Sequence, residues 1–148
     1  MERVSAPPQR HVLLVDDDRA TVTGLTKLLA TDGYRVFPLT SGGDAVAAIS
    51  ANAFDVIITD LEMPDADGHA IVCAARKHSP NACLVVHTGQ ASQKRDELVD
   101  GGACFVVDKP LDYETLSDAL RACPRRASQD SAECPLQAEL VRLGLRSG

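Results

Sequence analysis

Five short apolar runs divide the chain at regular intervals. They are continuous rather than alternating, which is typical of strands buried on both faces of a parallel sheet. Segments with apolar residues at helical spacing follow each run. The predicted strands are residues 11–16, 34–39, 56–60, 82–88 and 104–108. The predicted helices are residues 19–31, 42–51 between a cap at Ser41 and a stop at Asn52, 69–77, 92–100 and 113–122.

This alternation predicts an α/β fold. Parallel strands that follow one another along the chain need right-handed helical crossovers, so we expect a doubly wound, five-stranded parallel sheet of the flavodoxin-like type. The fourth predicted helix is polar, with only Leu98 and Val99 strongly apolar. We therefore expect that helix to dock weakly on the sheet.

Polar side chains follow four of the predicted strands. Asp16 ends the first and Asp17 follows it, Asp60 ends the third, Thr88 ends the fourth and Lys109 follows the fifth. Ligands bind at the carboxyl edge of open parallel sheets, so these groups should converge there. Clustered carboxylates need a cation, and oxygen ligands suit Mg²⁺. The pattern predicts phosphoryl transfer to an aspartate.

From about residue 11 to 122 the chain resembles the receiver domain of two-component response regulators. Four motifs in order carry this resemblance: Val15-Asp16-Asp17, Asp60-x-x-Met63-Pro64-x-x-Asp67-Gly68, Thr88-Gly89 and Lys109-Pro110. The resemblance implies the (βα)5 receiver fold and a phosphoacceptor that takes phosphate from a histidine kinase or a histidine phosphotransfer protein. It implies a signalling protein that assists its own phosphorylation and dephosphorylation, rather than an enzyme.

The resemblance also assigns roles to single residues. Asp60 would accept the phosphate, Asp17 would ligate Mg²⁺ directly, and Asp16 would ligate it through a water. The backbone carbonyl of Glu62 would complete the protein ligands. The remaining polar groups would bind the phosphoryl oxygens, through the ammonium of Lys109 and the hydroxyl of Thr88. The bond between Lys109 and Pro110 is usually cis in this family.

Three positions are expected to tune the response. Gly89 has no side chain to shield the phosphorus, and the side chain of Glu62 would order or repel the attacking water. Receivers usually carry an aromatic ring where this chain has Val106, so the usual switch between Thr88 and that ring should be absent. We expect activation to act through residues 89–92 and the helix that follows.

Charge and composition limit the kinds of partner that the protein can bind. The formal net charge of −6 and the pI near 5.1 argue against direct nucleic-acid binding. No apolar stretch approaches the roughly 20 residues that cross a bilayer, and the first residues lack a signal peptide's apolar region. We expect a cytoplasmic protein that meets a kinase and a downstream protein of unknown identity, with a weak homodimer as an open alternative. The five cysteines are interpreted as buried thiols, and His87 as an ordinarily hydrogen-bonded histidine.

Outside the predicted receiver domain at residues 11–122 the sequence is less informative. Residues 1–10 are predicted to be a disordered extension. Residues 123–148 are predicted to be a tail with a short amphipathic helix, in which Leu136, Leu140 and Leu143 share one face. No length remains for an effector domain, so the chain is interpreted as a single-domain receiver, with a fragment of a longer protein as the open alternative.

Other interpretations use the same residues differently. In haloacid-dehalogenase-type phosphatases Asp16 would be the nucleophile and Asp18 the general acid, but Ala20 departs from that pattern and Thr88 stays unexplained. A flavodoxin-like electron carrier needs aromatic residues, which make up only 3% of this chain. An adaptor that is not phosphorylated would not need the full acidic set. Taken alone, the pair Asp16 and Asp17 could simply cap a helix.

Overall fold

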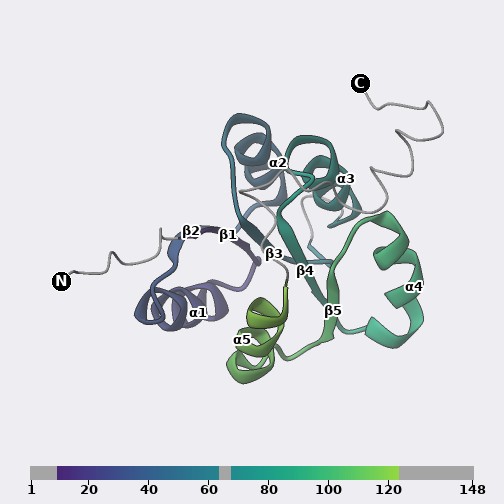
Figure 1. Cartoon of the computed structure of the whole chain (residues 1–148). Helices are drawn as coiled ribbons and strands as arrows, with labels where there is room; N and C mark the ends of the chain where they lie inside the picture. The colour runs from purple at the N-terminus through teal and green to yellow at the C-terminus, as the bar shows by residue number, and fades with distance from the viewer. Residues whose placement is uncertain (1–9, 64–67, 124–148) are drawn as a thin grey trace.

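A computed structural model describes residues 10–63 and 68–123, and these form one α/β unit (Figure 1). Its strands are β1 (His11–Val15), β2 (Arg35–Leu39), β3 (Val56–Asp60), β4 (Cys83–Thr88) and β5 (Phe105–Asp108). Its helices are α1 (Arg19–Thr31), α2 (Gly42–Ala51), α3 (Gly68–His78), α4 (Ala91–Gly101) and α5 (Tyr113–Ala122). The strands and helices alternate along the chain, as the sequence predicts.

All strand pairs are parallel, in the order β2-β1-β3-β4-β5. The order reverses beside β1, so the connecting helices cover both faces of the sheet. Helices α1 and α5 lie on one face, and α2, α3 and α4 lie on the other (Figure 1). The predicted doubly wound fold is confirmed.

The core has two layers because successive strand side chains point to opposite faces. In β1, Leu13 and Val15 pack with residues of α2, α3 and α4, whereas Val12 and Leu14 pack with residues of α1 and α5. All four side chains are fully buried. Continuous apolar runs are therefore required here, since neither face of the central strands meets water.

Local signals fix where the helices begin and end. Asp18, Ser41 and Asp112 cap α1, α2 and α5, and each side chain accepts a backbone N–H of the first turn. Gly33 follows α1 with a φ of 96°, a conformation that glycine adopts without steric cost. Four strands are each one residue shorter than predicted: β1, β2, β4 and β5. Two helices, α3 and α4, are one residue longer than predicted at each end.

Helix α4 buries few of its side chains. Leu98 is buried in the core, whereas Val99 is exposed. Ala91 supplies the other buried side chain of this helix. Only one of the two strongly apolar residues of α4 therefore faces inward, and weak docking of this helix stays a prediction.

The cysteines differ from the prediction that they are buried thiols. Cys73 and Cys104 are exposed, and Cys83 forms a disulfide with Cys123. The interpretation as buried thiols was therefore wrong for these four. It failed because Cys83 and Cys123 lie 40 residues apart, and only the tertiary fold brings their Cα atoms to 6.2 Å.

The predicted chain ends lie largely outside the description. Residues 1–9 and 124–148 are not described, so the predicted extension and tail helix stay predictions. Cys123, which the prediction placed in the tail, is buried and packs with Leu116 and Leu120. In the part of the chain that the structure covers, no helix is long and apolar enough to cross a membrane.

Candidate functional site

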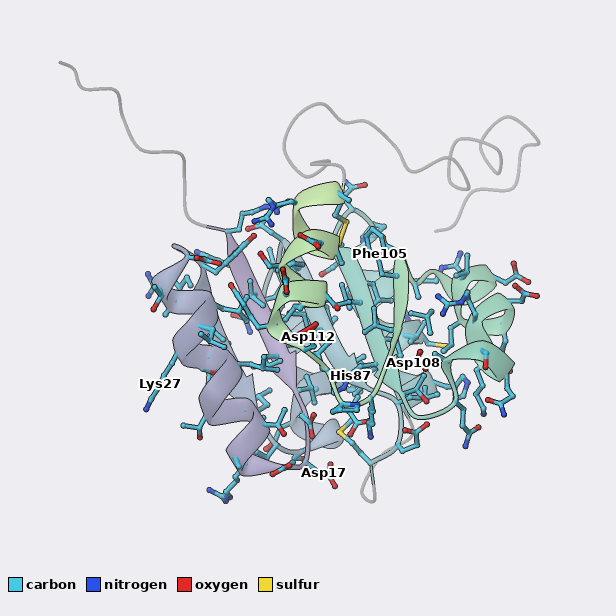
Figure 2. The ribbon with its side chains drawn as sticks, turned by 90° about the horizontal axis from the view of Figure 1, so that it is seen from below. Asp17, Lys27, His87, Phe105, Asp108 and Asp112 are labelled. Atoms are coloured by element: carbon cyan, nitrogen blue, oxygen red, sulfur yellow. A yellow bond between two sulfur atoms is a disulfide. The ribbon has the colours of Figure 1, made fainter. Side chains whose placement is uncertain are left out.

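The predicted acidic residues meet at the carboxyl edge of the sheet. Asp16 and Asp17 follow β1, and Asp60 is the last residue of β3. One carboxylate oxygen from each lies within 4.8 Å of the others. Asp16 and Asp60 are buried, whereas Asp17 is exposed and reaches the cluster from the solvent side. Figure 2 shows Asp17 at the same end of the molecule as His87.

Asp60 is the most enclosed member, with 1% of its surface exposed. Its Oδ1 atom accepts the ammonium of Lys109 at 2.7 Å and the backbone N–H of Glu62 at 3.0 Å. Burial raises the pKa of Asp60 above its ordinary value, although both bonds act to lower it. Burial alone would lower the pKa of Lys109, but the hydrogen bonds to Asp60 and Glu62 and the charges of both carboxylates together outweigh it, and the pKa is raised. The lysine is therefore charged at neutral pH.

The backbone places Lys109 accurately. Its N–H donates to the carbonyl of Thr88 at 3.1 Å, which continues the pairing of β4 and β5 past the end of the strand. The bond between Lys109 and Pro110 is cis, as the family resemblance implies. Because β4 lies between β3 and β5 in the sheet, the ammonium reaches Asp60 across the end of β4.

Asp16 is the second buried member of the cluster, with 5% of its surface exposed. Burial raises its pKa to about 6, with smaller contributions from the charges of Asp60 and Asp17, while the N–H of Asp18 donates to Oδ1 at 2.9 Å and opposes the shift. A carboxylate with this pKa gains from a cation more than an exposed one does. The arrangement therefore favours metal binding over simple capping of α1.

Asp18 is the residue that caps α1. Its carboxylate accepts the N–H of Ala20 at 3.1 Å and the hydroxyl of Thr21 at 2.9 Å. It is exposed and fully engaged by the first turn. This placement disfavours the phosphatase interpretation, in which Asp18 would act as a general acid beside Asp16.

His87 differs from its prediction. It is buried beneath the site, and neither ring nitrogen has a hydrogen-bond partner among the described residues. Nε2 lies 3.4 Å from Oδ2 of Asp16, but burial lowers the pKa of His87 to about 4. The imidazole is neutral at pH 7, so this contact is a close approach rather than an ion pair. The expectation of ordinary hydrogen bonding was wrong.

The side chain of Glu62, which the sequence analysis expects to act on the attacking water, lies over the site and makes contacts that were not predicted. Its carboxylate accepts the hydroxyl of Thr88, the N–H of Gly89 at 3.4 Å and the ammonium of Lys109 at 3.3 Å. Partial burial would raise its pKa, but these bonds together lower it. Glu62 is therefore ionised at neutral pH, and it binds three donors that the sequence assigns to a phosphoryl group or its surroundings.

Thr88 and Val106, the two positions of the predicted switch, are both buried. Thr88 is fully buried, and its hydroxyl oxygen accepts the N–H of Gln90 at 3.0 Å. Val106 is buried on the face of the sheet that α4 covers, whereas Phe105 packs on the opposite face of the sheet. The guanidinium of Arg95 donates to the carbonyl of Val106 at 2.7 Å. No ring lies at position 106 to move between a buried and an exposed state.

The donor set fits a magnesium ion. Asp16, Asp17 and Asp60 offer only oxygen atoms, which hard divalent cations prefer, and the exposed Asp17 leaves one side open to water. Pro64 and Asp67, which belong to the second motif, lie outside the described residues, while Met63 and Gly68 are buried. These oxygen donors and the ammonium of Lys109 therefore lie together at one edge of the sheet.

Comparison with protein families gives an independent result. The response regulator receiver domain matches residues 12–121. The photosynthetic apparatus regulatory protein RegA of Rhodobacter capsulatus is 35% identical over 136 residues, which cover 90% of this chain and 72% of RegA. The transcriptional regulatory protein ZraR of Salmonella typhimurium is 31% identical over 135 residues, or 90% of this chain. The chain spans only 30% of ZraR and 53% of the response regulator MprA from a Mycobacterium species.

Solved structures agree with this result. A CheY-like receiver domain protein from Methanospirillum hungatei is 26% identical, with a TM-score of 0.72 over 77% of this chain and 92% of that one. The receiver domain of the sensor histidine kinase PA1611 from Pseudomonas aeruginosa is 25% identical, with a TM-score of 0.68 over 78% of this chain and 98% of that one. That structure holds a magnesium ion in its active-site cleft. This chain belongs to the response regulator receiver domain family.

Proposed function

We propose that this receiver accepts a phosphoryl group on Asp60 from a histidine kinase or a histidine phosphotransfer protein. One observation carries the proposal: a buried carboxylate is held by the ammonium of Lys109 and lies within 4.8 Å of two further carboxylates. Such a group is oriented by fixed charges before any donor arrives. Its chemistry is nucleophilic attack by a carboxylate oxygen on phosphorus as the donor nitrogen leaves.

The surrounding residues would stabilise charge rather than form bonds. The ammonium of Lys109, which pairs with Asp60 before transfer, would then pair with a transferred phosphoryl oxygen. The hydroxyl of Thr88 would donate to another of these oxygens. Fixed donors of this kind supply most of what phosphoryl transfer requires. The protein therefore assists its own phosphorylation while acting as a signalling component.

Asp17, Asp16 and the backbone carbonyl of Glu62 would hold Mg²⁺, with Asp16 acting through a water. When bound, the ion would neutralise part of the charge on the phosphoryl oxygens. The fit of the oxygen donors supports this assignment, as does the magnesium in the related PA1611 receiver. We place this chemistry in the cytoplasm, with readout through contacts to a downstream protein rather than to nucleic acid or a membrane.

Backbone amide NMR with beryllofluoride, which mimics a phosphoryl group on a carboxylate, tests the function and the switch together. With Mg²⁺ present, we expect the largest shift changes near Asp60 and across residues 88–100, and small changes at Val106. A chelator should reverse them. A spectrum that does not respond to beryllofluoride would refute the phosphoacceptor proposal, and changes centred on Val106 would refute the proposed switch.

Removing the charge of Glu62 should speed phosphorylation. Its carboxylate now engages Thr88, Gly89 and Lys109, and it must leave or share these donors when a phosphoryl group arrives. Glu62→Gln should therefore raise the rate of labelling by acetyl phosphate about threefold to tenfold, equivalent to roughly 0.7–1.4 kcal/mol in the barrier. The matched control is Glu114→Gln, an exposed glutamate in the first turn of α5. A slower Glu62→Gln protein would mean that the carboxylate positions the reacting groups instead of competing with them.

Gly89 would govern how long the phosphoryl group lasts. It is exposed, and a Cβ atom added there would meet nothing within 4 Å, so a side chain can be introduced without a clash. Gly89→Val should narrow the path of the attacking water and slow dephosphorylation several-fold. The decay of labelled protein after removal of the donor measures this effect, and an unchanged half-life would show that water reaches phosphorus by another path.

A further inference from the structure

Three cysteines gather at the end of the sheet opposite the acidic site. Cys83 is the first residue of β4, Cys104 precedes β5, and Cys123 directly follows α5. Their sulfur atoms all lie within 4.8 Å of one another, and Cys83 and Cys123 are joined in a disulfide. Figure 2 shows this bond near Phe105, at the opposite end of the molecule from Asp17. We call these three residues the cysteine cluster.

The backbone holds the cluster in place. The N–H of Cys83 donates to the carbonyl of Asp55 at 2.9 Å, and the N–H of Cys104 donates to the carbonyl of Leu84 at 2.8 Å. These bonds belong to the pairing of β3, β4 and β5 at their amino ends. The positions of Cys83 and Cys104 are therefore set by the sheet, while Cys123 arrives with the last turn of α5.

The three sulfur groups differ in their access to solvent. Cys83 and Cys123 are only 3% and 6% exposed, and they pack in the core with Val85, Leu116 and Leu120. Cys104 is exposed and carries a free thiol. A reducing thiolate must reach a disulfide sulfur directly, because exchange proceeds through attack on that sulfur. The buried bond is therefore shielded from reagents in solution, but not from its own neighbour.

We propose that the cysteine cluster is a redox-active site that exchanges with low-molecular-weight thiols, and that Cys104 is the residue that meets them. Two of its three sulfur atoms are already joined, so the cluster as it stands offers one reactive thiol rather than a set of metal ligands. This arrangement suits a relay between solvent and a buried disulfide.

The first step is an exchange within the protein that needs no other reagent. The thiolate of Cys104 attacks the sulfur of Cys123, a bond forms between these two sulfurs, and Cys83 leaves as a thiolate that takes up the proton lost by Cys104. A small thiol then attacks the exposed sulfur of Cys104, which forms a mixed disulfide and frees Cys123 as a thiol. A second small thiol releases Cys104 and departs as the oxidised dimer. Two small thiols are thus oxidised as one protein disulfide is reduced.

The redox state would change how α5 is attached. In the oxidised protein a covalent bond joins the end of α5 to the start of β4, and in the reduced protein only packing holds it there. Thr88 lies at the other end of β4, roughly 16 Å away at about 3.3 Å per residue. The cluster is thus separate from the acidic site, and its chemistry does not depend on phosphorylation of Asp60.

The test is the rate at which reduced glutathione opens the disulfide in the full chain. Samples are quenched with an alkylating reagent and analysed by peptide mass spectrometry. Cys104→Ser should slow the reduction at least tenfold, whereas the control Cys73→Ser, which changes an exposed cysteine on α3, should not. Wild-type protein should carry glutathione transiently on Cys104. Thermal unfolding of each oxidised variant checks that the fold is kept.

Several outcomes would overturn the proposal. One is reduction of Cys104→Ser at the wild-type rate, and another is a mixed disulfide that forms first on Cys83 or Cys123. The chain has a fifth cysteine, Cys134, outside the described residues. If Cys134→Ser slows reduction as strongly as Cys104→Ser does, the relay is not the one assigned. Absence of a bond between Cys83 and Cys123 after air oxidation would refute the site itself.

Discussion

Replacing Asp60 with asparagine should abolish phosphoryl labelling by acetyl phosphate, with a loss of at least about 100-fold. An amide oxygen is a poor nucleophile at neutral pH, and the amide cannot replace the charge that faces the metal position. Asparagine has the same shape, so its Oδ1 atom can still accept the ammonium of Lys109 and the N–H of Glu62. The loss would therefore be chemical rather than structural.

Asp108→Asn is the matched control. Asp108 is the last residue of β5 and is exposed, so the same change is made at the end of a neighbouring strand. This protein should be labelled at the wild-type rate. If Asp60→Asn gains the same base-labile phosphate as wild type, another carboxylate is the acceptor, and Asp16 becomes the first residue to replace.

The Asp60→Asn protein should also be at least as stable as wild type at pH 7. The pKa of Asp60 is raised in the folded protein, chiefly by burial, so ionisation opposes folding. That cost is present above the folded pKa and disappears as the pH falls through it toward the ordinary value. Urea unfolding at several pH values measures this, and the advantage of asparagine should shrink as the solution becomes acidic. A variant that is much less stable at pH 7 would contradict this account.

The fold could be predicted because its signals are local and agree with one another. Continuous apolar runs such as the one in β3 identify strands buried on both faces. Caps at Ser41 and Asp18 mark where helices begin. Strand ends shifted by one residue because pairing depends on the neighbouring strand, which the local pattern does not contain.

The acidic part of the site was also predictable, for a topological reason. Parallel strands place all their carboxyl ends at one edge, so Asp60, Thr88 and Lys109 had to converge once their strands were identified. The position of the Glu62 side chain was not predictable in this way. Its bonds to Thr88 and Gly89 depend on the course of the backbone after β3, and no local pattern fixes that course.

The residues that were misinterpreted share a physical cause. Whether Cys104 is exposed, or His87 lacks a partner, depends on what the rest of the fold places next to each side chain. Cys83 and Cys123 pair across 40 residues of sequence, and a count of cysteines cannot reveal such a pairing. Composition indicated small apolar side chains, and only tertiary structure distinguishes a thiol from half of a disulfide.

A close contact between Gly68 and Leu61, in the segment after β3, predicts a second large mutational effect. Gly68 begins α3, is buried, and donates its N–H to the carbonyl of Leu61 at 3.2 Å. A Cβ atom at this position would lie 2.6 Å from both the Cα and the carbonyl oxygen of Leu61. These are backbone atoms, which cannot rotate away as a flexible side chain can. Either α3 or the strand end must move to make room.

Gly68→Ala should therefore destabilise the protein by roughly 2–4 kcal/mol, the range of a severe overpacking change. The melting temperature should fall by about 5–15 °C, since 1 kcal/mol corresponds to about 2–4 °C for a chain of this size. The control is Gly24→Ala, in the middle of α1, where a Cβ atom would meet nothing within 4 Å. That change should stabilise the protein by about 0.5–1 kcal/mol, because alanine favours the helix.

The same substitution should affect the site. Leu61 lies between Asp60 and Glu62, so a displacement at Leu61 moves the carboxylate that would accept phosphate and the N–H that donates to it. We expect Gly68→Ala protein, measured well below its melting temperature, to be labelled more slowly than wild type, whereas Gly24→Ala protein is labelled normally. Wild-type stability and labelling in Gly68→Ala would mean that the contact with Leu61 relaxes without cost. A loss of stability with normal labelling would mean that α3 moves and the end of β3 does not.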